Sequence, residues 1–291
     1  MRILNFGSLN YDYVYSLPHI VMPGETIASI KMEIFCGGKG LNQSIALAKA
    51  GANVYHAGMI GEDGGQLCDI LVDNGVNIEH VKQIDGKSGH AIIQVEESGQ
   101  NSIVLFGGSN RRITKEYIDN VLSQFEKGDY LLLQNEVNLV DYLIEEAHSK
   151  GLRIILNPSP YDHQLDCCDF NKIDTFLLNE VEGYQITGKT EPEEILDEML
   201  RRYPKACVVL TLGDKGARYG QGEKRYSQSS FKVEVVDTTA AGDTFTGFYL
   251  AEVMRGHEVS KALEFAAKAS AIAVGRLGAA NSIPKLEEVE V

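Results

Sequence analysis

A carboxylate stands directly after a run of small residues at the start of a predicted helix. The run is Ala240-Ala241-Gly242, followed by Asp243, and the apolar positions from Phe245 onwards have helical spacing. Exposed backbone N–H groups at a helix start attract anions such as phosphate. Because the carboxylate of Asp243 would repel a phosphate unless it met a hydroxyl beside it, the pattern indicates phosphoryl transfer to an alcohol.

Such a transfer needs an aligned acceptor, a sink for the charge on the transferring group and a carboxylate that takes the hydroxyl proton. We assign Asp243 as this base, and the amides of Ala240, Ala241 and Gly242 as an anion hole. The alternative is that Asp243 is an ordinary acidic residue in the first turn of a helix, where the helix dipole favours it. A second glycine-rich motif, earlier in the chain, favours catalysis.

The second motif is Gly37-Gly38-Lys39-Gly40-Leu41-Asn42-Gln43. Its glycines let the backbone approach a ligand closely, and Lys39 and Asn42 project at the head of the following helix. Together with the stretch that ends in Asp243, it resembles the two signatures of the ribokinase-like, or PfkB, family of carbohydrate and nucleoside kinases. The similarity extends from Ser8 to Ser282, which is nearly the whole chain.

This resemblance implies ATP-dependent transfer of the γ-phosphate to the hydroxymethyl group of a sugar, with O5 of D-ribose as the favoured acceptor. A nucleoside kinase, or another sugar kinase of the family with the same mechanism, is the alternative. A nucleoside would need a larger and more apolar pocket beside the sugar. A non-catalytic sugar sensor on the same scaffold is a third interpretation, and the intact Asp243 with its glycine-rich approach argues against it.

The resemblance also implies which residues bind each ligand. The hydroxyls of the sugar would be bound by Asn10, Asp12, Gly38, Lys39, Asn42, Glu136 and Asp243. Carboxylates accept hydrogen bonds and amides both donate and accept them, which suits vicinal hydroxyls. The nucleotide would be bound by Asn179, Glu182, Thr211, Gly213, Gly216 and Gly242, with Mg²⁺ held at Glu182 through water. A monovalent cation, expected to be K⁺, would be bound by Asp237, Thr239, Ala273, Arg276, Gly278 and Ser282.

Several of these residues have structural interpretations that the sequence leaves open. Asn10 and Glu136 follow predicted strands, where polar residues often form turns or caps. Asn179 could cap a helix whose first turn contains Glu182, and without the resemblance this interpretation is preferred. The stretch 211–216 could be a plain β-turn.

Three features stand out against the family pattern. Thr246 follows Gly-Asp-Thr-Phe at a position where the family commonly has Asn, and Gly107-Gly108-Ser109-Asn110 replaces the usual Gly-Ala-Asn run. Both changes are modest. Tyr11 lies between the expected sugar ligands Asn10 and Asp12. We therefore expect Tyr11 to narrow the pocket and to influence which sugar fits.

Composition and charge argue against several other classes. The chain has 291 residues and a formal net charge of −14, whereas nucleic acids and anionic membranes bind proteins through an excess of Lys and Arg. No apolar stretch is long enough to span a membrane and residues 1–7 read as a strand rather than a signal peptide, so we expect a cytoplasmic protein. The five cysteines lack the spacing of a zinc site or a disulfide framework. Walker, dinucleotide-binding and protein-kinase motifs are absent from the sequence.

Strand and helix patterns alternate along most of the chain, which predicts a parallel sheet with helices on both faces. We expect one ribokinase-like domain over residues 1–291, with a three-layer α/β/α fold and a mostly parallel central sheet. Strands are predicted at 2–7, 53–58, 130–134, 153–157, 175–179 and 207–212, with short ones near 217–219 and 224–226. Helices are predicted from about 40 to 51 and at 66–74, 114–125, 140–149, 193–202, 241–255 and 260–276. Polar residues after the strands fall at the carboxyl edge, where such sheets bind ligands.

Two regions interrupt this alternation, at about 11–35 and 89–107. Segments 11–16 and 25–35 have strand character without a helix between them, and 90–95 and 102–106 flank a turn, which predicts a hairpin. We expect these segments to form a small antiparallel sheet, called the lid, as the resemblance implies. Such a sheet would have one apolar face, so we expect a homodimer in which two lids cover each other.

Overall fold

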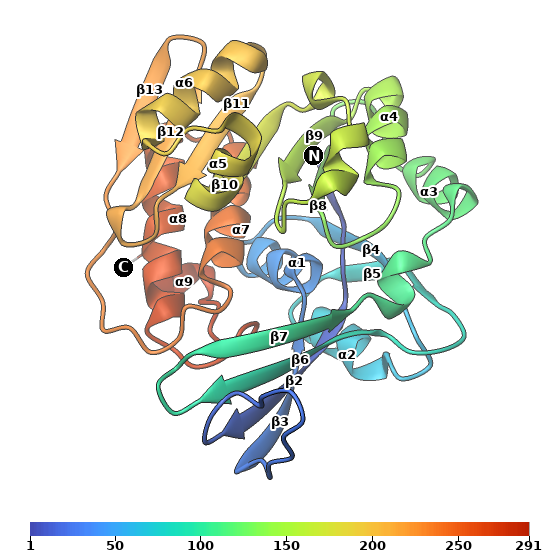
Figure 1. Ribbon diagram of the computed structural model, residues 1–291. Coiled ribbons are helices and arrows are strands. Elements are labelled where there is room, and N and C mark those ends of the chain that lie inside the picture. Colours follow the sequence, from blue (N-terminus) through green and yellow to red (C-terminus); the bar gives the residue numbers. More distant parts are fainter. Residues whose placement is uncertain (291) are drawn as a thin grey trace.

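A nine-stranded sheet forms the centre of the molecule (Figure 1). The computed structural model describes residues 1–290. The strands of this sheet are β1 Ile3–Phe6, β4 Val54–Ile60, β5 Asn77–Gln83, β8 Tyr130–Gln134, β9 Arg153–Asn157, β10 Thr175–Asn179, β11 Cys207–Thr211, β12 Ala217–Gln221 and β13 Lys224–Gln228. Their order is β13-β12-β11-β10-β9-β8-β1-β4-β5. Neighbours are parallel from β11 to β5, whereas β12 pairs with β11 and β13 in antiparallel fashion.

Helices cover both faces of this sheet. One face carries α1 Lys39–Lys49, α2 Gly65–Asp73, α7 Ala241–Met254 and α8 Val259–Val274. The other carries α3 Lys115–Leu122, α4 Val140–Lys150, α5 Glu180–Thr187 and α6 Pro192–Arg202. A short helix, α9 Leu286–Val289, follows α8. Successive side chains of a strand point to opposite faces, so Leu131 and Leu133 enter one core while Leu132 enters the other. The predicted three-layer α/β/α fold is confirmed.

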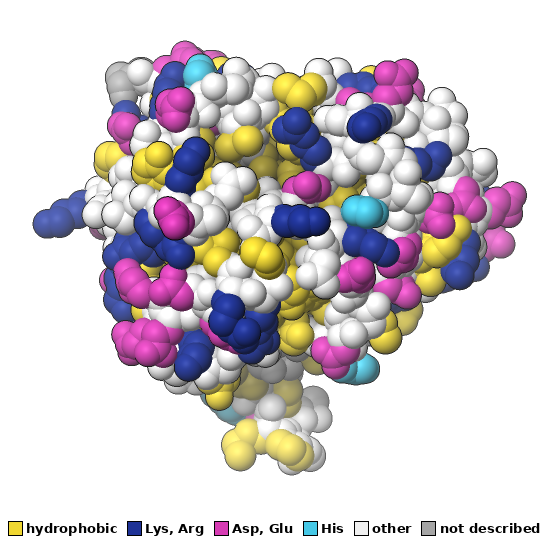
Figure 2. Space-filling model, turned by 90° about the horizontal axis from the view of Figure 1, so that it is seen from above, with side chains coloured by type: hydrophobic (Ala, Val, Ile, Leu, Met, Phe, Trp, Pro, Cys, Tyr) yellow, Lys and Arg dark blue, Asp and Glu magenta, His cyan; other side chains and the backbone are white. Residues whose placement is uncertain are grey.

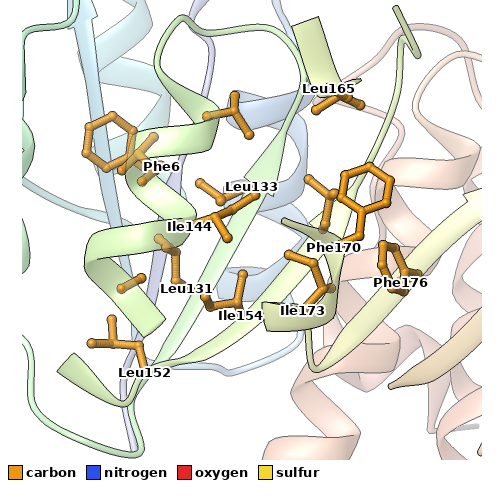
Figure 3. Packing of buried hydrophobic residues seen from close by; sticks show 14 of the residues in the cluster. Phe6, Leu131, Leu133, Ile144, Leu152, Ile154, Leu165, Phe170, Ile173 and Phe176 are labelled. Carbon is orange, nitrogen blue, oxygen red and sulfur yellow. The ribbon is translucent and has the colours of Figure 1, made fainter. Parts of the chain in front are cut away.

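Figure 3 shows the core between the sheet and α4. Leu131 and Leu133 of β8 lie against Ile144 of α4, and all three are fully buried. Nearby, the rings of Phe170 and Phe176 meet edge to face with centroids 5.5 Å apart. Burial of apolar surface contributes about 25 cal/mol per Å². This packing therefore holds the carboxyl ends of neighbouring strands firmly at one edge of the sheet.

Most elements lie close to their predicted positions, and β5 is the strand that was missed. It is the edge strand of the sheet, and its side chains are mixed: Ile78 and Val81 are partly buried, whereas Glu79 and Lys82 are exposed. Because only one side of β5 is paired and its apolar pattern is short, the sequence carried a weak strand signal. Helix α5 had been considered only as the alternative interpretation of Asn179.

The lid is a four-stranded sheet beside the main one (Figure 1). Its strands are β2 Asn10–Leu17, β3 Lys31–Gly37, β6 Gly89–Glu96 and β7 Asn101–Phe106, in the order β3-β2-β6-β7. The predicted hairpin of β6 and β7 is confirmed, but β2 and β6 are parallel, so the prediction of a fully antiparallel sheet was wrong. Both β2 and β6 follow parallel strands of the main sheet, and both therefore run outward from it in the same direction.

Strand β3 is shorter than the predicted segment 25–35. Its first residue, Lys31, pairs with Ser16 near the far end of β2. The amide of Ile30 still donates to the carbonyl of Ser16 at 2.8 Å, but residues before Ile30 extend past the end of β2 at Leu17 and cannot continue the ladder, although their sequence has strand character.

Exposed apolar side chains lie on both faces of the lid rather than on one. Residues paired across strands share a face, so Ile34, Ile92 and Val104 point to one side. Ile103 and Leu105 point to the other, and the exposed fraction is 40% or more for all five. The prediction of a single apolar face was wrong because the lid projects away from the helix layers that cover the main sheet (Figure 1).

The face of the molecule seen in Figure 2 carries side chains of both charges. Figure 2 shows acidic and basic side chains interspersed on the face seen from above, so the acidic excess is not gathered into one block there. Across residues 1–290, none of the helices has both the length and the apolar character needed to cross a bilayer.

Candidate active site

Helices α1 and α7 cross at close range and bring the two glycine-containing motifs together. A Cβ atom at Gly247 would lie 2.4 Å from the Cβ of Ala46 and 2.7 Å from the backbone nitrogen of Leu47. A larger residue at 247 would therefore push the helices apart. The crossing places Asp243 against α1, although its partner there is 200 positions away in the sequence.

Two side-chain amides of α1 donate hydrogen bonds to the carboxylate of Asp243. Nδ2 of Asn42 lies 3.1 Å from Oδ2, and Nε2 of Gln43 lies 2.9 Å from Oδ1. The Oδ1 atom of Asn42 is buried and has no hydrogen-bond partner within residues 1–290. Buried polar atoms are rarely left unpaired, so an acceptor suited to a ligand hydroxyl stands beside the carboxylate. The structure thus brings Asp243 to the motif of residues 37–43.

The start of α7 leaves backbone amides accessible. Ala240 adopts the left-handed conformation with φ 60° and ψ 8°, which is uncommon for a residue with a side chain and is typical of functional sites. A Cβ atom at Gly242 would meet nothing within 4 Å. The amide of Ala241 donates to the carbonyl of Thr238 at 3.2 Å, so one of the three amides expected to bind an anion is already engaged. In the described chain the amides of Ala240 and Gly242 have no acceptor.

Lys39 provides a positive charge among three carboxylates. Burial disfavours its charged form, but Asp243, Glu136 and Glu182 outweigh burial and raise the pKa of Lys39. Burial also raises the pKa of Glu136, although Lys39 and the hydroxyl of Ser8 oppose that shift. Oε2 of Glu136 accepts hydrogen bonds from the backbone amide of Lys39 at 2.9 Å and from the hydroxyl of Ser8. A protonated Lys39 held in this way can attract a phosphate oxygen.

Asn10 and Asp12 lie on the face of β2 that adjoins the glycine motif. A Cβ atom at Gly37 would lie 2.1 Å from Oδ2 of Asp12, so a larger residue there would displace the Asp12 carboxylate. Oδ1 of Asn10 accepts a hydrogen bond from Nδ2 of Asn110 at 2.7 Å. Asn110 was not predicted as part of the site, although it ends the stretch 107–110 that differs from the family's usual Gly-Ala-Asn run.

A cavity of about 230 Å³ lies at the carboxyl ends of β9, β10 and β11. Of the predicted residues, those that line it are Lys39, Asn179, Glu182, Thr211, Ala240, Gly242 and Asp243. Residues without a predicted role that also line it are Asn157, Ser159, Leu177, Leu178, Thr238 and Thr246. Asn157 is a polar residue at the end of the predicted strand 153–157, which is the signal that could have found it.

Of the predicted sugar ligands, Lys39 and Asp243 line this cavity and the others do not. Asn10, Asp12 and Glu136 gather around Gly38 and the start of α1. Lys39 belongs to both groups, because it lines the cavity and its backbone amide binds Glu136. The site therefore has two parts, one beside the lid and one at the edge of the main sheet.

Asn179 and Glu182 form a capping box at the start of α5. Oδ1 of Asn179 accepts from the amides of Val181 and Glu182 at 2.8 and 3.1 Å, and Oε2 of Glu182 accepts from the amide of Asn179 at 2.9 Å. The structural interpretation of this pair is therefore correct. Both residues also line the cavity, so the cap fixes a carboxylate in its wall. Their roles toward a nucleotide and Mg²⁺ stay predictions.

The glycines after β11 do not line the cavity, whereas Thr211 does. Gly216 has φ 92°, and a Cβ atom there would lie 2.0 Å from the carbonyl oxygen of Gln228. The close approach that requires glycine at 216 is thus made by the end of β13. A Cβ atom at Gly213 would meet open space, although its φ of 57° still favours glycine.

The loop before α7 is bound to the chain after α8 through Asp237. Oδ1 accepts from the amide and hydroxyl of Thr239 at 2.8 and 2.6 Å, and Oδ2 accepts from the amide of Gly278 at 3.0 Å. Burial would raise the pKa of Asp237, but these donors lower it. Three of the residues predicted to bind a monovalent cation are thus brought together.

The other three are engaged nearby. The carbonyl of Ala273 accepts from the amide of Arg276 at 3.0 Å, the guanidinium of Arg276 pairs with Glu288, and the hydroxyl of Ser282 donates to the carbonyl of Ala279 at 2.8 Å. Their role toward a cation stays a prediction.

Tyr11 points away from the predicted sugar ligands Asn10 and Asp12. Side chains alternate along β2, so Tyr11 points to the opposite face from Asn10 and Asp12. It is 5% exposed, and its hydroxyl donates to the carbonyl of Asp63 at 2.7 Å. The expectation from its position between two ligands was wrong because neighbours in a strand face opposite ways.

Comparison with known proteins bears on the chemistry of this geometry. The family model described as pfkB family carbohydrate kinase matches residues 2–286. The chain belongs to this family. As a PfkB carbohydrate kinase, the protein is a phosphotransferase.

Relatives of this PfkB kinase cover nearly its whole length. It is 36% identical over 303 residues to the ribokinase of Bacillus subtilis (strain 168), with 99% of this chain and 98% of that protein covered. The ribokinase of Cryptococcus neoformans var. grubii serotype A, solved in complex with ADP, has a TM-score of 0.88 at 32% identity over 99% of this chain and 98% of that one. The ribokinase of Arabidopsis thaliana, solved with ribose and ATP, has a TM-score of 0.87 at 30% identity over 99% of this chain and 97% of that one.

Asp12 should make the stability of this PfkB kinase depend on pH. Burial, and after it the charge of Glu136, raises the pKa of Asp12 to about 7. Between about pH 4 and pH 7 the folded protein holds a proton that the unfolded chain releases. The contribution to the free energy of unfolding is thus fully present below about pH 4 and is lost as the pH rises through about 7.

We expect Asp12→Asn to remove this loss. The free energy of unfolding can be measured with urea at about pH 4.5 and about pH 7.5. Relative to the wild type, the free energy of unfolding of the variant should be higher at about pH 7.5 than at about pH 4.5, by roughly 2–4 kcal/mol. The same difference between the two proteins at both pH values would contradict the raised pKa of Asp12.

Proposed function

We propose that the protein transfers the γ-phosphate of ATP to O5 of D-ribose. The observation that carries this proposal is the carboxylate of Asp243, held by two amides of α1 beside the open start of α7. Membership of the PfkB family establishes the reaction class. The choice of ribose draws support from the ribokinases to which the chain is similar, one of them solved with ribose and ATP.

In the proposed reaction, the hydroxymethyl oxygen of the sugar forms a bond to the γ-phosphorus. Asp243 accepts the proton that this oxygen loses. The bond from that phosphorus to the bridging oxygen breaks, and ADP leaves with the electron pair. The transition state is loose, so the proton leaves late and a carboxylate is a sufficient base. The amides of Ala240 and Gly242 and the ammonium of Lys39 would stabilise the charge on the transferring group. The amide of Ala241 would have to release the carbonyl of Thr238 before it could join them.

The sugar is proposed to bind where β2 meets the start of α1. Carboxylates at Asp12 and Glu136 and amides at Asn10 and Asn42 offer acceptors and donors to neighbouring hydroxyls. The unpaired Oδ1 of Asn42 is the strongest support, because a buried acceptor next to the base gains a partner when a hydroxyl arrives.

The cavity is proposed to bind the phosphates of ATP with Mg²⁺. Its lining suits them, since Lys39 is cationic, Gly242 is open to close approach and Glu182 presents a fixed carboxylate. Glu182 would hold Mg²⁺ through water, as suits a cation that keeps several waters. Bound there, Mg²⁺ neutralises charge on the phosphate oxygens.

A nucleoside acceptor is the second candidate. Leu105 and Ile103 lie exposed on the same face of the lid as Asp12, and such apolar side chains could cover a base attached to the sugar. A sugar sensor without catalysis has no comparable support, because Asp243 and both open amides are present.

We also propose that K⁺ binds at the loop held by Asp237. Asp237 and Thr239 lie immediately before the open amides of α7, so a cation there would set the shape of the anion hole. The lowered pKa of Asp237 fits this role, because an ionised carboxylate with oxygen neighbours suits a hard cation.

The lid is further proposed to form a homodimer with the lid of a second copy. Ile103 and Leu105 are 56% and 49% exposed, and covering such side chains gains free energy in proportion to the buried area. A second lid offers a matching apolar surface.

The acceptor and the base can be tested together. ADP release should be fastest with D-ribose in a panel of pentoses, hexoses and nucleosides. Asp243→Asn keeps the shape of the side chain but removes the base, so kcat should fall by about 10²- to 10⁴-fold, with sugar binding by calorimetry largely intact.

Asp197→Asn, on the exposed side of α6, is the matched control and should turn over like the wild type. Faster turnover with nucleosides would identify the second candidate, and sugar binding without turnover would favour the sensor. Substantial turnover by Asp243→Asn would overturn the assignment of the base.

The cation site predicts a dependence on K⁺. Replacing K⁺ with tetramethylammonium should lower turnover severalfold, because the larger ion cannot enter a site made of close oxygen atoms. Asp237→Asn should be slow in either salt. A wild-type rate that is the same in both salts would remove the proposal.

The lid predicts a dimer in sedimentation equilibrium. Ile103→Lys should shift the wild-type dimer to monomer, because an ammonium cannot be buried between two apolar lids without a partner. Val72→Lys makes the same change at an exposed position on α2 and should leave the dimer intact. A wild-type protein that sediments as a monomer at assay concentration would refute the proposal.

A further inference from the structure

We propose that Gln43 is a positioning residue for the catalytic base, and that a relay of buried amides through Gln134 and Asn5 fixes the direction in which it donates. The inference rests on the proposed role of Asp243. It assigns a role to the last residue of the motif at 37–43 and to two residues outside both motifs.

The orientation of the Gln43 amide decides its effect on the base. Nε2 of Gln43 donates to Oδ1 of Asp243 at 2.9 Å, while Asn42 serves Oδ2. A glutamine amide turned by half a rotation would instead present its oxygen to the carboxylate, and the two would repel each other. Something must therefore set which end of the amide faces Asp243.

One end of the relay is fixed by a backbone carbonyl. Nδ2 of Asn5 donates to the carbonyl of Gly40 at 2.8 Å, and a carbonyl can only accept. Oδ1 of Asn5 must then face the other way, where it accepts from Nε2 of Gln134 at 2.9 Å. The same Nε2 donates to Oε1 of Gln43 at 2.7 Å. The oxygen of Gln43 is thus turned toward Gln134, which leaves its NH₂ group for Asp243.

A second carbonyl imposes the same direction from the opposite side. Nδ2 of Asn157 donates to the carbonyl of Leu177 at 2.7 Å. Oδ1 of Asn157 is therefore free to accept, and Nε2 of Gln43 lies 3.3 Å from it. Two independent anchors, on β1 and β9, agree on the orientation of one amide.

The amides of this relay are shielded from water. Asn5, Gln43 and Gln134 are all 0% exposed, so water cannot replace a lost bond and each hydrogen bond acts in a low dielectric. A Cβ atom at Gly7 would lie 2.4 Å from Oε1 of Gln134, so the neighbouring strand end is kept bare to admit this side chain.

The relay determines which lone pairs of the Asp243 carboxylate stay available to a ligand. Each oxygen of Asp243 has one lone pair engaged by an amide of α1, and Asp243 also lines the cavity. The remaining lone pairs are those available to the sugar hydroxyl. A carboxylate free to rotate would spend less time in this orientation, so loss of the relay should lower the rate of the chemical step rather than the affinity for sugar.

The test is a double-mutant cycle on kcat with ribose and ATP. Gln43→Met keeps the volume but removes the donor, and kcat should fall by about 10- to 100-fold, the worth of a hydrogen bond to a charged group. The KM for ribose should change by less than about twofold. Gln134→Met should lower kcat less, and it should have no further effect when Gln43→Met is already present. Gln124→Met, at an exposed position after α3, is the matched control and should leave kcat unchanged.

Unchanged kcat in Gln43→Met would overturn the proposal even if the melting temperature fell, because Gln43 would then be purely structural. Additive losses of kcat in the double variant would overturn the relay, since the two residues would then act independently. If Gln43→Met does not fold, Gln134→Met alone still decides, because an unchanged kcat in that variant also overturns the relay.

A readout without turnover separates this inference from the proposed function. The side-chain NH₂ resonances of Gln43 in a ¹⁵N-labelled protein should shift in Asp243→Asn, which removes the charged acceptor, and also in Gln134→Met. They should not shift in Gln124→Met. If no sugar is phosphorylated, the proposed function fails while these shifts still show the relay, and resonances that stay in place in both variants would overturn it.

Discussion

The hydrogen bonds from Asn42 and Gln43 of α1 to Asp243 of α7 join the two glycine-containing motifs. They can form because α1 and α7 touch almost backbone to backbone at Gly247 and Ala46. No long side chain lies between the helices at that contact, so a change in their separation cannot be taken up by a change of rotamer. The distance from the base to Asn42 and Gln43 is therefore set by the packing of two helices and not by the conformation of a loop.

Charge in the site follows from the same arrangement. The protein carries a formal net charge of −14, so an anionic substrate is not drawn in by the molecule as a whole. Local groups must provide the attraction, and they do so in different ways. Lys39 stays protonated because three carboxylates surround it, and the start of α7 adds uncharged N–H donors that need no counter-ion. The carboxylates thus keep the lysine charged, and that of Glu136 also accepts a hydrogen bond from the hydroxyl of Ser8.

The layered fold could be read from the sequence, as could the sheet edge where the candidate site lies, because both depend on local patterns. Buried parallel strands appear as apolar runs, helices have their own spacing, and the glycine motifs mark where backbone must come close. The parts that failed depend on tertiary pairing. The direction of β2 relative to β6, the start of β3 at Lys31 and the orientation of Tyr11 are matters of register and of side-chain alternation. Propensity carries no information about them.

Gly216 and Asn110 also show that contacts between distant segments cannot be read from the sequence. Gly216 was expected to admit a ligand, yet the atom it makes room for belongs to Gln228, a contact between segments that sequence alone does not join. Asn110 had no expected role, yet it holds the side chain of Asn10. The relay through Gln134 was likewise hidden, because a polar residue at the end of an apolar strand looks like any strand terminus until its partners are known.

The proposed sugar ligands are divided between the lid and the helix layer of the main sheet, which has a mechanical consequence. Asn10 and Asp12 are carried by the first strand of the lid, whereas Lys39 and Asn42 belong to a helix packed on the main sheet. If the lid tilts, the proposed contacts of Asn10 and Asp12 with the sugar would lengthen, while the hydrogen bonds from Asn42 and Gln43 to Asp243 would stay formed. In the proposed reaction, release of the product would then need only the lid to move, and Asp243 would already be aligned for the next substrate.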